Sequence, residues 1–496
     1  MSGFSKVLVA NRGEIALRII RTLDEMGIAS AAIASEADRL APHALAAGEC
    51  VVVGPAAASE SYLNASAVLR AAAGTGCDAV HPGYGFLSEN AGFAEACAGA
   101  GITFIGPPAA AIRAMGSKTA SRETMERAGV PVVPGFQEPG ADDAAIAEAA
   151  GRLGYPVLVK ASSGGGGKGM RVVHDPGALA GALSLCRSEA EAAFGDPTVY
   201  LERYLQRPRH VEVQVFGDAS GAVFHLGERE CSVQRRHQKI LEESPSPAVG
   251  PELRERMGRA AVTAAEAVGY RNAGTVEFLL DPRGEFYFLE MNTRLQVEHP
   301  VTELVYGVDL VAAQVATAAG DPPGFDPASL VPRGHAVEAR LYAEDPAAGF
   351  LPQAGTVAIL RLPERPGVRV DSGLREGLEI DVHYDPLLAK ITAWDRTRTA
   401  ATRRLRNALE DCVVLGVATN LDFLIDVLGL PAWESGDLHI QFLEEHLPAW
   451  SAPVSEDPRV LALAGAAGSG AGTAGGRGYP SPWATLGTWS PMDRGK

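Results

Sequence analysis

The chain has 496 residues, of which 46% are hydrophobic and 21% charged, and its formal net charge is −16. This length is too great for one hydrophobic core and predicts two to four structural units. The acidic balance argues against nucleic-acid binding through backbone phosphates, and no apolar run reaches the ~18 residues that a membrane span requires. The six cysteines form no Cys-x-x-Cys pair, and the N-terminus lacks a signal-peptide layout. We therefore expect a protein of the prokaryotic cytoplasm.

Strands and helices are expected to alternate over the first hundred residues. A short apolar run at 6–10 precedes an apolar stripe with helical spacing over 15–26. Further strand-like runs lie at 29–34, 78–81 and 102–105. This alternation predicts a parallel, doubly wound sheet whose ligands lie at the carboxyl ends of the strands. The segments 11–14 and 81–86 follow such ends, and tight turns without a ligand would explain them equally well.

A glycine-rich segment follows in the second hundred residues. Residues 161–169 read ASSGGGGKG and lie between the strand-like runs 156–160 and 170–173. Glycine backbone N–H groups can approach a phosphate closely, and Lys168 adds a positive charge. Three of the glycines match G-x-G-x-x-G, but a strand follows where a dinucleotide site needs a helix. The pattern predicts a flap over phosphates, with a plain flexible hairpin as the alternative.

A pair of acids is expected further along the chain. The strand-like runs 275–281 and 286–292 are joined by the turn residues 282–285. With these four residues as the loop, Glu277 lies opposite Glu290 with ~5 Å between their Cβ atoms. Facing carboxylates repel each other unless a cation lies between them, and magnesium prefers such carboxylates together with phosphate oxygens. The pairing therefore indicates a metal site.

Polar residues continue at every second position after Glu290, namely Asn292, Arg294, Gln296 and Glu298. An extended backbone would place them along one face. A solvated strand face alternates in the same way, but the paired acids favour a metal and anion site.

Two other groups could supply charge to such a site. His210, Glu212 and Gln214 alternate along one strand, and residues 234–239 read QRRHQK. A solvated basic loop and a site for a substrate anion explain this run equally well. Cys231, which lies just before it, is interpreted as a small core residue and not as a nucleophile.

Together these segments resemble the signatures of biotin carboxylases. The resemblance is carried by Lys160 with the glycine flap, VANRGEIA at 9–16, HPGYGFLSE at 81–89, ERECSVQRRHQK at 228–239, EMNTRLQVEH at 290–299, EAR at 338–340 and YDPLLAK at 384–390. It extends over roughly residues 4–447 in consistent order.

The resemblance implies an α/β fold of several parts. These are a Rossmann-like N-terminal domain at 1–115, an ATP-grasp lid with the flap at 116–204, an ATP-grasp central domain at 205–332 and an α/β C-terminal domain at 333–447. Residues 448–496, which are rich in Ala, Gly and Ser, predict a flexible linker or tail.

The resemblance also implies roles for individual residues. ATP would be bound by Lys118, Lys160, Gly165, Gly166, Gly167, Lys168, Glu202, Leu205, His210, His237, Glu277 and Glu290. Magnesium or manganese would be held by Glu277, Glu290 and Asn292, and bicarbonate by Lys239, Arg294, Gln296 and the backbone of Val297. Among the catalytic residues Glu298, Arg340, Lys239 and Arg294, Glu298 would be the base. Arg340 would stabilise the biotin enolate, and Tyr84 would lie beside the biotin ring.

The implied activity is the ATP- and bicarbonate-dependent carboxylation of biotin through carboxyphosphate, the first half-reaction of an acyl-CoA carboxylase. No methionine in this chain precedes a lysine, whereas carriers of the family present Ala-Met-Lys-Met. Biotin is therefore expected in trans, on a biotin carboxyl carrier protein or domain. A carboxyltransferase subunit and a second copy of the chain are the other expected partners. The final acceptor (an acetyl-, propionyl-, methylcrotonyl- or geranyl-CoA) is not specified.

Two alternatives remain. Another ATP-grasp ligase, for carbamoyl phosphate or an amino acid, would share the flap and the metal acids but has no need for the surroundings of Arg340. A nucleotide-binding regulatory protein that has lost catalysis would require a broken site, and the catalytic residues named above are all present.

Overall fold

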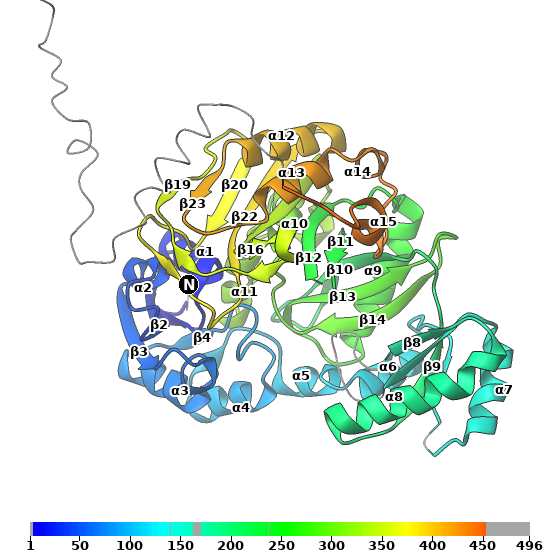
Figure 1. Ribbon diagram of the computed structural model, residues 1–496. Helices are drawn as coiled ribbons and strands as arrows, with labels where there is room; N and C mark the ends of the chain where they lie inside the picture. The colour runs from blue at the N-terminus through cyan, green and yellow to red at the C-terminus, as the bar shows by residue number, and fades with distance from the viewer. Residues whose placement is uncertain (1–2, 139, 162–169, 237, 453–496) are drawn as a thin grey trace, which may run out of the picture. The chain divides into compact units, whose positions relative to one another are not determined.

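The structure is a computed structural model that describes residues 3–138, 140–161, 170–236 and 238–452 (Figure 1). Its largest sheets have five, eight and four strands, and helices pack against them. The arrangement is α/β, with a parallel Rossmann-like sheet at the N-terminus, as the sequence predicts. The flap residues 162–169 and His237 lie outside the described residues, so the predictions for Gly165, Gly166, Gly167, Lys168 and His237 have no structural counterpart here.

The N-terminal sheet is parallel, with the strand order β3-β2-β1-β4-β5. Its strands are β1 (Lys6–Val9), β2 (Ala29–Ser35), β3 (Glu49–Gly54), β4 (Ala79–His81) and β5 (Thr103–Phe104), and its helices are α1 (Gly13–Glu25), α2 (Pro42–Ala46), α3 (Ala65–Gly74), α4 (Ala91–Gly99) and α5 (Ala109–Met115). The turns after β1 and β4 meet at one edge, because the Asn11 side-chain amide donates to the carbonyls of Pro82 (2.6 Å) and Tyr84 (2.8 Å).

A four-stranded sheet follows, in the order β6-β9-β7-β8. It contains β6 (Gly135–Phe136), β7 (Val157–Ala161), β8 (Met170–Val173) and β9 (Val199–Arg203), together with helices α6 (Lys118–Ala128), α7 (Asp143–Leu153) and α8 (Leu179–Phe194). β7 and β8 are antiparallel neighbours, which confirms one strand before the glycine segment and one strand after it. Aliphatic residues of α7 and α8 pack with β7 and β8 in one small core.

The third sheet has eight antiparallel strands in the order β14-β13-β10-β11-β12-β15-β22-β20. They are β10 (Arg209–Gly217), β11 (Val223–Arg235), β12 (Gln238–Ser244), β13 (Asn272–Leu280), β14 (Phe286–Asn292), β15 (His335–Tyr342), β20 (Val368–Ser372) and β22 (Leu387–Asp395). β12 pairs with β15, with Glu242 opposite Glu338. The sheet thus continues across the predicted boundary at 332/333, and the predicted domain limits stay a prediction.

Most of the remaining elements pack against this sheet or connect its strands, and the short strands pair in three two-stranded sheets. The helices are α9 (Pro251–Glu266), α10 (His299–Tyr306), α11 (Leu310–Ala318), α12 (Arg398–Glu410), α13 (Leu421–Leu428), α14 (Pro431–Ser435) and α15 (Phe442–His446), and the short strands are β16 (Glu344–Asp345), β17 (Leu351–Pro352), β18 (Gly355–Thr356), β19 (Ile359–Arg361), β21 (Glu379–Ile380) and β23 (Val413–Leu415). Over the described residues, no single helix has the length and apolar character to cross a membrane, and only α10 with α11, bent by 94°, pass that test as a pair.

Candidate active site

The hairpin of β13 and β14 pairs Glu277 with Glu290, as the sequence predicts. Near the turn the register differs by one residue from the expected one, since Phe286 faces Leu280. The Asp281 carboxylate accepts the backbone N–H groups of Arg283 (2.8 Å) and Glu285 (3.0 Å), which draws Asp281 into the turn. A bulge between Glu277 and Phe278 then restores the register and brings the two acids opposite each other.

The chain after β14 departs from the expected extended backbone. The strand ends at Asn292, and Val297 and Glu298 form a turn that leads into α10. Pro300 occupies the first turn of that helix, a position at which proline favours a helix start. The prediction of a strand face reaching Glu298 is therefore wrong, because the backbone bends at Arg294, two residues after the end of the strand. After the bend, Gln296 still reaches the same place as Asn292.

That place is the carboxylate of Glu277. One of its oxygens accepts hydrogen bonds from the Asn292 amide (2.9 Å), the Gln296 amide (3.1 Å) and the Lys239 ammonium (2.9 Å). Its other oxygen lies 2.9 Å from His210 Nε2. Four residues predicted for the site from separate segments are thus gathered on one acid.

Arg294 lies beside this group and bonds its neighbours. Its guanidinium donates to the side-chain oxygens of Gln296 (2.8 Å) and Asn292 (3.1 Å) and to Glu89 (2.9 Å). Glu89 also accepts the backbone N–H of Thr293 at 2.9 Å. The N-terminal segment that contains Glu89 therefore helps to fix the loop after β14.

Lys239 on β12 is the central cation. Its ammonium lies 2.6 Å from Glu212, 2.9 Å from Glu277 and 2.7 Å from Glu298. Burial alone would lower the pKa of Lys239, but these three carboxylates hold that pKa well above its ordinary value. The lysine is therefore a permanent positive charge in a buried site.

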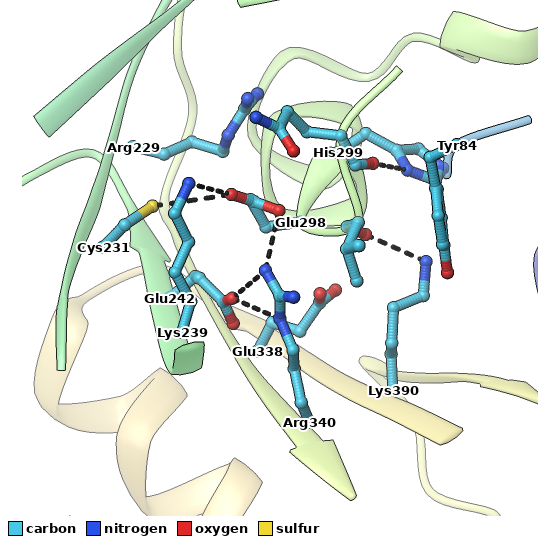
Figure 2. A network of polar contacts seen from close by, with 12 residues as sticks. Tyr84, Arg229, Cys231, Lys239, Glu242, Glu298, His299, Glu338, Arg340 and Lys390 are labelled. Carbon is cyan, nitrogen blue, oxygen red and sulfur yellow. Dashed lines mark hydrogen bonds and ion pairs between the residues drawn. The ribbon is translucent and has the colours of Figure 1, made fainter. Parts of the chain in front are cut away.

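Glu298 lies between Lys239 and Arg340 (Figure 2). Arg340 donates to Glu298 at 2.8 Å and to Glu242 at 2.5 Å. Burial would raise the pKa of Glu298, but the neighbouring cations Lys239, Arg340 and Arg229 hold it well below its ordinary value. Burial raises the pKa of Glu242 to about 8 despite the opposing charge of Arg340. Glu298 and Glu242 both bond Arg340, but their pKa values are shifted in opposite directions.

The structure also reveals a buried arginine for which the sequence analysis gave no role. Arg229 on β11 is fully buried and donates to Glu212 (2.5 Å), to Gln214 (2.7 Å) and to the hydroxyls of Thr302 (2.9 Å) and Thr275 (3.0 Å). Its Glu212 partner is also one of the three acids on Lys239. Arg229 lies in the charged run 228–230, but the sequence does not show which neighbouring strands this run meets.

Replacing Arg229 by methionine should lower the free energy of unfolding by roughly 3–5 kcal/mol, because Glu212 then remains buried with half of its counter-charge lost. Chemical denaturation at neutral pH measures this change. The control is Arg259→Met, whose side chain is 69% exposed and which should change stability by less than about 0.5 kcal/mol. Equal midpoints and slopes for Arg229→Met and the wild type would contradict the expectation.

The remaining predicted residues lie in two other places. Lys160 bonds Glu202 at 2.8 Å, and Leu205, a few residues beyond, is buried. The Tyr84 hydroxyl donates to Glu14 at the edge where the turns after β1 and β4 meet. Lys118 begins α6, and its side chain is outside the described part of the structure.

The acids of the hairpin suit a hard divalent cation. Glu277 and Glu290 face each other and Asn292 follows on the same strand, so the donors are oxygens of the kind that magnesium prefers. Cys231 lies 3.8 Å from Glu298, and burial raises the pKa of its thiol well above the ordinary value. The thiol is therefore neutral, which agrees with its interpretation as a core residue.

Comparison with known proteins places this site in a family. Three family profiles match successive segments: biotin carboxylase, N-terminal domain (3–112), carbamoyl-phosphate synthase L chain, ATP binding domain (117–323) and biotin carboxylase C-terminal domain (338–445). A biotin carboxylase of Nostoc sp. is 48% identical over 442 residues, which cover 89% of this chain and 99% of the relative. The chain belongs to the biotin carboxylase family.

Other members differ in length and assembly. The methylcrotonoyl-CoA carboxylase subunit alpha of Mus musculus is 48% identical over 464 residues, and the match spans 65% of that longer protein. Among solved structures, the biotin carboxylase domain dimer of the Hydrogenobacter thermophilus 2-oxoglutarate carboxylase, in complex with MgADP, ADP and bicarbonate, has a TM-score of 0.84 and 43% identity. That match covers 91% of this chain and 100% of the solved chain.

Proposed function

We propose that this biotin carboxylase family member carboxylates biotin with ATP and bicarbonate, as the first half-reaction of an acyl-CoA carboxylase. The observation that carries the proposal is the buried carboxylate of Glu298 held between two cations, Lys239 and Arg340. A base next to two fixed positive charges suits a reaction in which one anion must be deprotonated and another stabilised.

In the first step Glu298 removes the proton of bicarbonate while a bicarbonate oxygen attacks the γ-phosphorus of ATP. The bond to the β,γ-bridging oxygen breaks, and ADP and carboxyphosphate are formed. The low pKa of Glu298 keeps it ionised before substrate binds. A bound bicarbonate would share Lys239 and Arg294 with the surrounding acids, which raises the proton affinity of Glu298 when the proton is transferred.

In the second step carboxyphosphate breaks down to CO2 and phosphate. The phosphate takes the ureido proton of biotin, and the nitrogen then attacks CO2. Negative charge develops on the ureido oxygen, and Arg340 would stabilise it. Tyr84 is assigned to the side of the site where the biotin ring lies.

Nucleotide binding is assigned to residues of several segments, among which are Glu277 and Glu290. Lys118, Lys160, the glycine flap, Glu202, Leu205, His210 and His237 would contact ATP. Glu277, Glu290 and Asn292 would hold magnesium, which when bound neutralises charge on the phosphates. Lys239, Arg294, Gln296 and Val297 would hold bicarbonate.

Biotin would be supplied on a carrier protein or domain, and a carboxyltransferase subunit would use the product. A homodimer is proposed because the H. thermophilus relative is a dimer of biotin carboxylase domains. The final acceptor is left open, since similar proteins include both methylcrotonoyl-CoA and pyruvate carboxylase subunits. The cytoplasmic location stays a prediction.

Replacing Glu290 by glutamine should raise the magnesium concentration for half-maximal activity by about tenfold, because one of two carboxylate ligands loses its charge. Bicarbonate-dependent ATP hydrolysis, titrated with magnesium, measures the change. Glu285→Gln is the matched control, since Glu285 lies in the same hairpin and is 56% exposed. The same magnesium dependence for both variants would argue against the assigned metal site.

The function itself is tested by ATP hydrolysis with magnesium, with and without bicarbonate and free biotin. We expect hydrolysis that requires bicarbonate and rises with biotin, with carboxybiotin as product. Hydrolysis that depends on another amine or acid and ignores biotin would instead support a different ATP-grasp ligase. ATP that binds but is never hydrolysed would favour the regulatory alternative.

A further inference from the structure

A second buried lysine lies next to the catalytic arginine. Lys390 on β22 is fully buried and directly faces Arg340 on β15 and Asp371 on β20. Two cations opposite each other on neighbouring strands repel, and a buried ammonium is costly unless it is paired. An apolar residue would be less costly at this position, so the presence of a lysine needs an explanation.

The contacts of Lys390 indicate that explanation. Its ammonium donates to the backbone carbonyl of Val297 at 2.9 Å, the bond drawn from Lys390 in Figure 2. It also lies 3.2 Å from Glu14 and 3.9 Å from Asp371. The Val297 carbonyl belongs to the peptide that joins Val297 to Glu298. This peptide lies in a turn, outside any strand ladder. Lys390 therefore supplies a hydrogen bond to the backbone that carries the proposed base.

Glu14 extends the contact toward the N-terminal domain. It accepts the hydroxyl of Tyr84, whose ring lies 5.9 Å from the Lys390 ammonium. Burial raises the pKa of Glu14 to about 7 although Lys390 opposes this. A single ammonium thus contacts both the loop of Glu298 and the acid that orients Tyr84.

We propose that Lys390 is a positioning residue that holds the Val297–Glu298 peptide and, through Glu14, the Tyr84 ring. It thereby fixes the bicarbonate side and the biotin side of the site relative to each other. The inference rests on the proposed function, which assigns substrates to Val297, Glu298 and Tyr84. The competing explanation is that Lys390 only neutralises Glu14 and Asp371.

A double variant separates these explanations. Lys390→Met alone leaves Glu14 buried without its counter-charge, whereas Lys390→Met with Glu14→Gln removes both charges and keeps an acceptor for Tyr84. Asp371 keeps its ion pairs with Arg369 (2.7 Å) and Arg21 (2.9 Å) in this variant. If Lys390 were only a counter-ion, the double variant would therefore recover wild-type kinetics. If Lys390 holds the peptide, the double variant stays impaired because the Val297 carbonyl still lacks its donor.

The measurement is bicarbonate-dependent ATP hydrolysis by the full chain, with KM for bicarbonate, KM for ATP and kcat determined separately. For the double variant we expect a rise in the bicarbonate KM of about tenfold and a similar fall in kcat, with the ATP KM within about twofold, since small misplacements of reacting groups cost this much or more. A wild-type bicarbonate KM and kcat in the double variant would overturn the proposal.

Two further variants test whether an impaired double variant reflects only lost stability or failed folding. Arg18→Met removes another buried cation, which bonds Glu303 at 2.9 Å, and should lower thermal stability while leaving the bicarbonate KM within about twofold. If the double variant does not fold, Lys390→Arg replaces it. Arginine keeps the charge but cannot place its donor where the ammonium was, so positioning predicts a raised bicarbonate KM and a counter-ion role predicts a normal one.

Failure of the proposed function can be distinguished from failure of the role proposed for Lys390. A wild-type chain whose ATP hydrolysis ignores bicarbonate would remove the basis of the proposed function before any variant is compared. A wild-type chain that needs bicarbonate, together with an unimpaired double variant, would leave the function intact and reject only the role of Lys390.

Discussion

Replacing Glu298 by glutamine is expected to lower bicarbonate-dependent ATP hydrolysis by about a thousandfold, within the range for loss of a general base. The carboxylate is fully buried and lies 2.7 Å from Lys239 and 2.8 Å from Arg340. Glutamine keeps the size of the side chain but cannot accept a proton from bicarbonate. ATP binding should change by less than about twofold, because the nucleotide is assigned to other residues. Steady-state hydrolysis and a binding titration with ATP measure the two quantities.

The matched control is Glu338→Gln. Glu338 is also fully buried and bonds Thr392 at 2.7 Å, but burial raises its pKa to about 7. An acid with that pKa is partly protonated at neutral pH, so the neutral amide should lower activity by less than about tenfold. Equal losses in Glu298→Gln and Glu338→Gln would show that any change among the buried acids disturbs the site, and would contradict the assignment of the base.

Replacing Arg340 by methionine is expected to slow the two steps, ATP cleavage and biotin carboxylation, to different extents. Carboxybiotin formation should fall by about a hundredfold to a thousandfold, the usual effect of losing one donor to a developing oxyanion. ATP hydrolysis should fall less, by about tenfold, because Arg340 also bonds Glu298 and helps to orient it. The ratio of carboxybiotin formed to ADP formed, with labelled bicarbonate, measures the difference.

Arg340→Lys provides the comparison for this variant. Lysine keeps the positive charge but lacks the planar fork that reaches both Glu242 and Glu298, so its ratio of carboxybiotin to ADP should lie between those of the wild type and Arg340→Met. If the methionine variant loses both activities by the same factor, Arg340 acts only through Glu298 and its role toward biotin is rejected.

The acid pair of the hairpin shows how far local sequence patterns reach. Counting a four-residue turn predicted that Glu277 faces Glu290, and this pair is confirmed. The turn in fact takes in Asp281, because its carboxylate bonds backbone N–H groups within the turn. The pair is preserved only because a bulge compensates for this shift. Turn chemistry could be read from the sequence, whereas the compensating bulge could not.

The loop after the hairpin shows the opposite case. Period-two polar residues predicted a strand face up to Glu298, but the strand ends at Asn292. The Gln296 side chain reaches Glu277 because the backbone bends before α10, and the proline near the start of that helix was the sequence signal for the bend. The geometry of this loop was therefore predicted wrongly, and the assignment of its residues to the site stays a prediction.

Several buried charges could not have been assigned from the sequence. Arg229 on β11 is bonded to Glu212 on β10, Glu242 on β12 is bonded to Arg340 on β15, and Lys390 on β22 is bonded to the turn before α10. Alternation along a strand shows which residues share a face, but it does not show which strands are neighbours. The contacts of these buried charges could therefore be found only from the structure.

The most direct test of the account follows oxygen-18 from freshly dissolved, labelled bicarbonate during turnover with ATP, magnesium and biotin. If Glu298 activates bicarbonate for attack on the γ-phosphate, the inorganic phosphate released will carry an oxygen atom that came from bicarbonate. Mass spectrometry of the phosphate measures this transfer. Phosphate that contains only oxygen from ATP and solvent would show that water, and not bicarbonate, attacks ATP, and would contradict the proposed reaction.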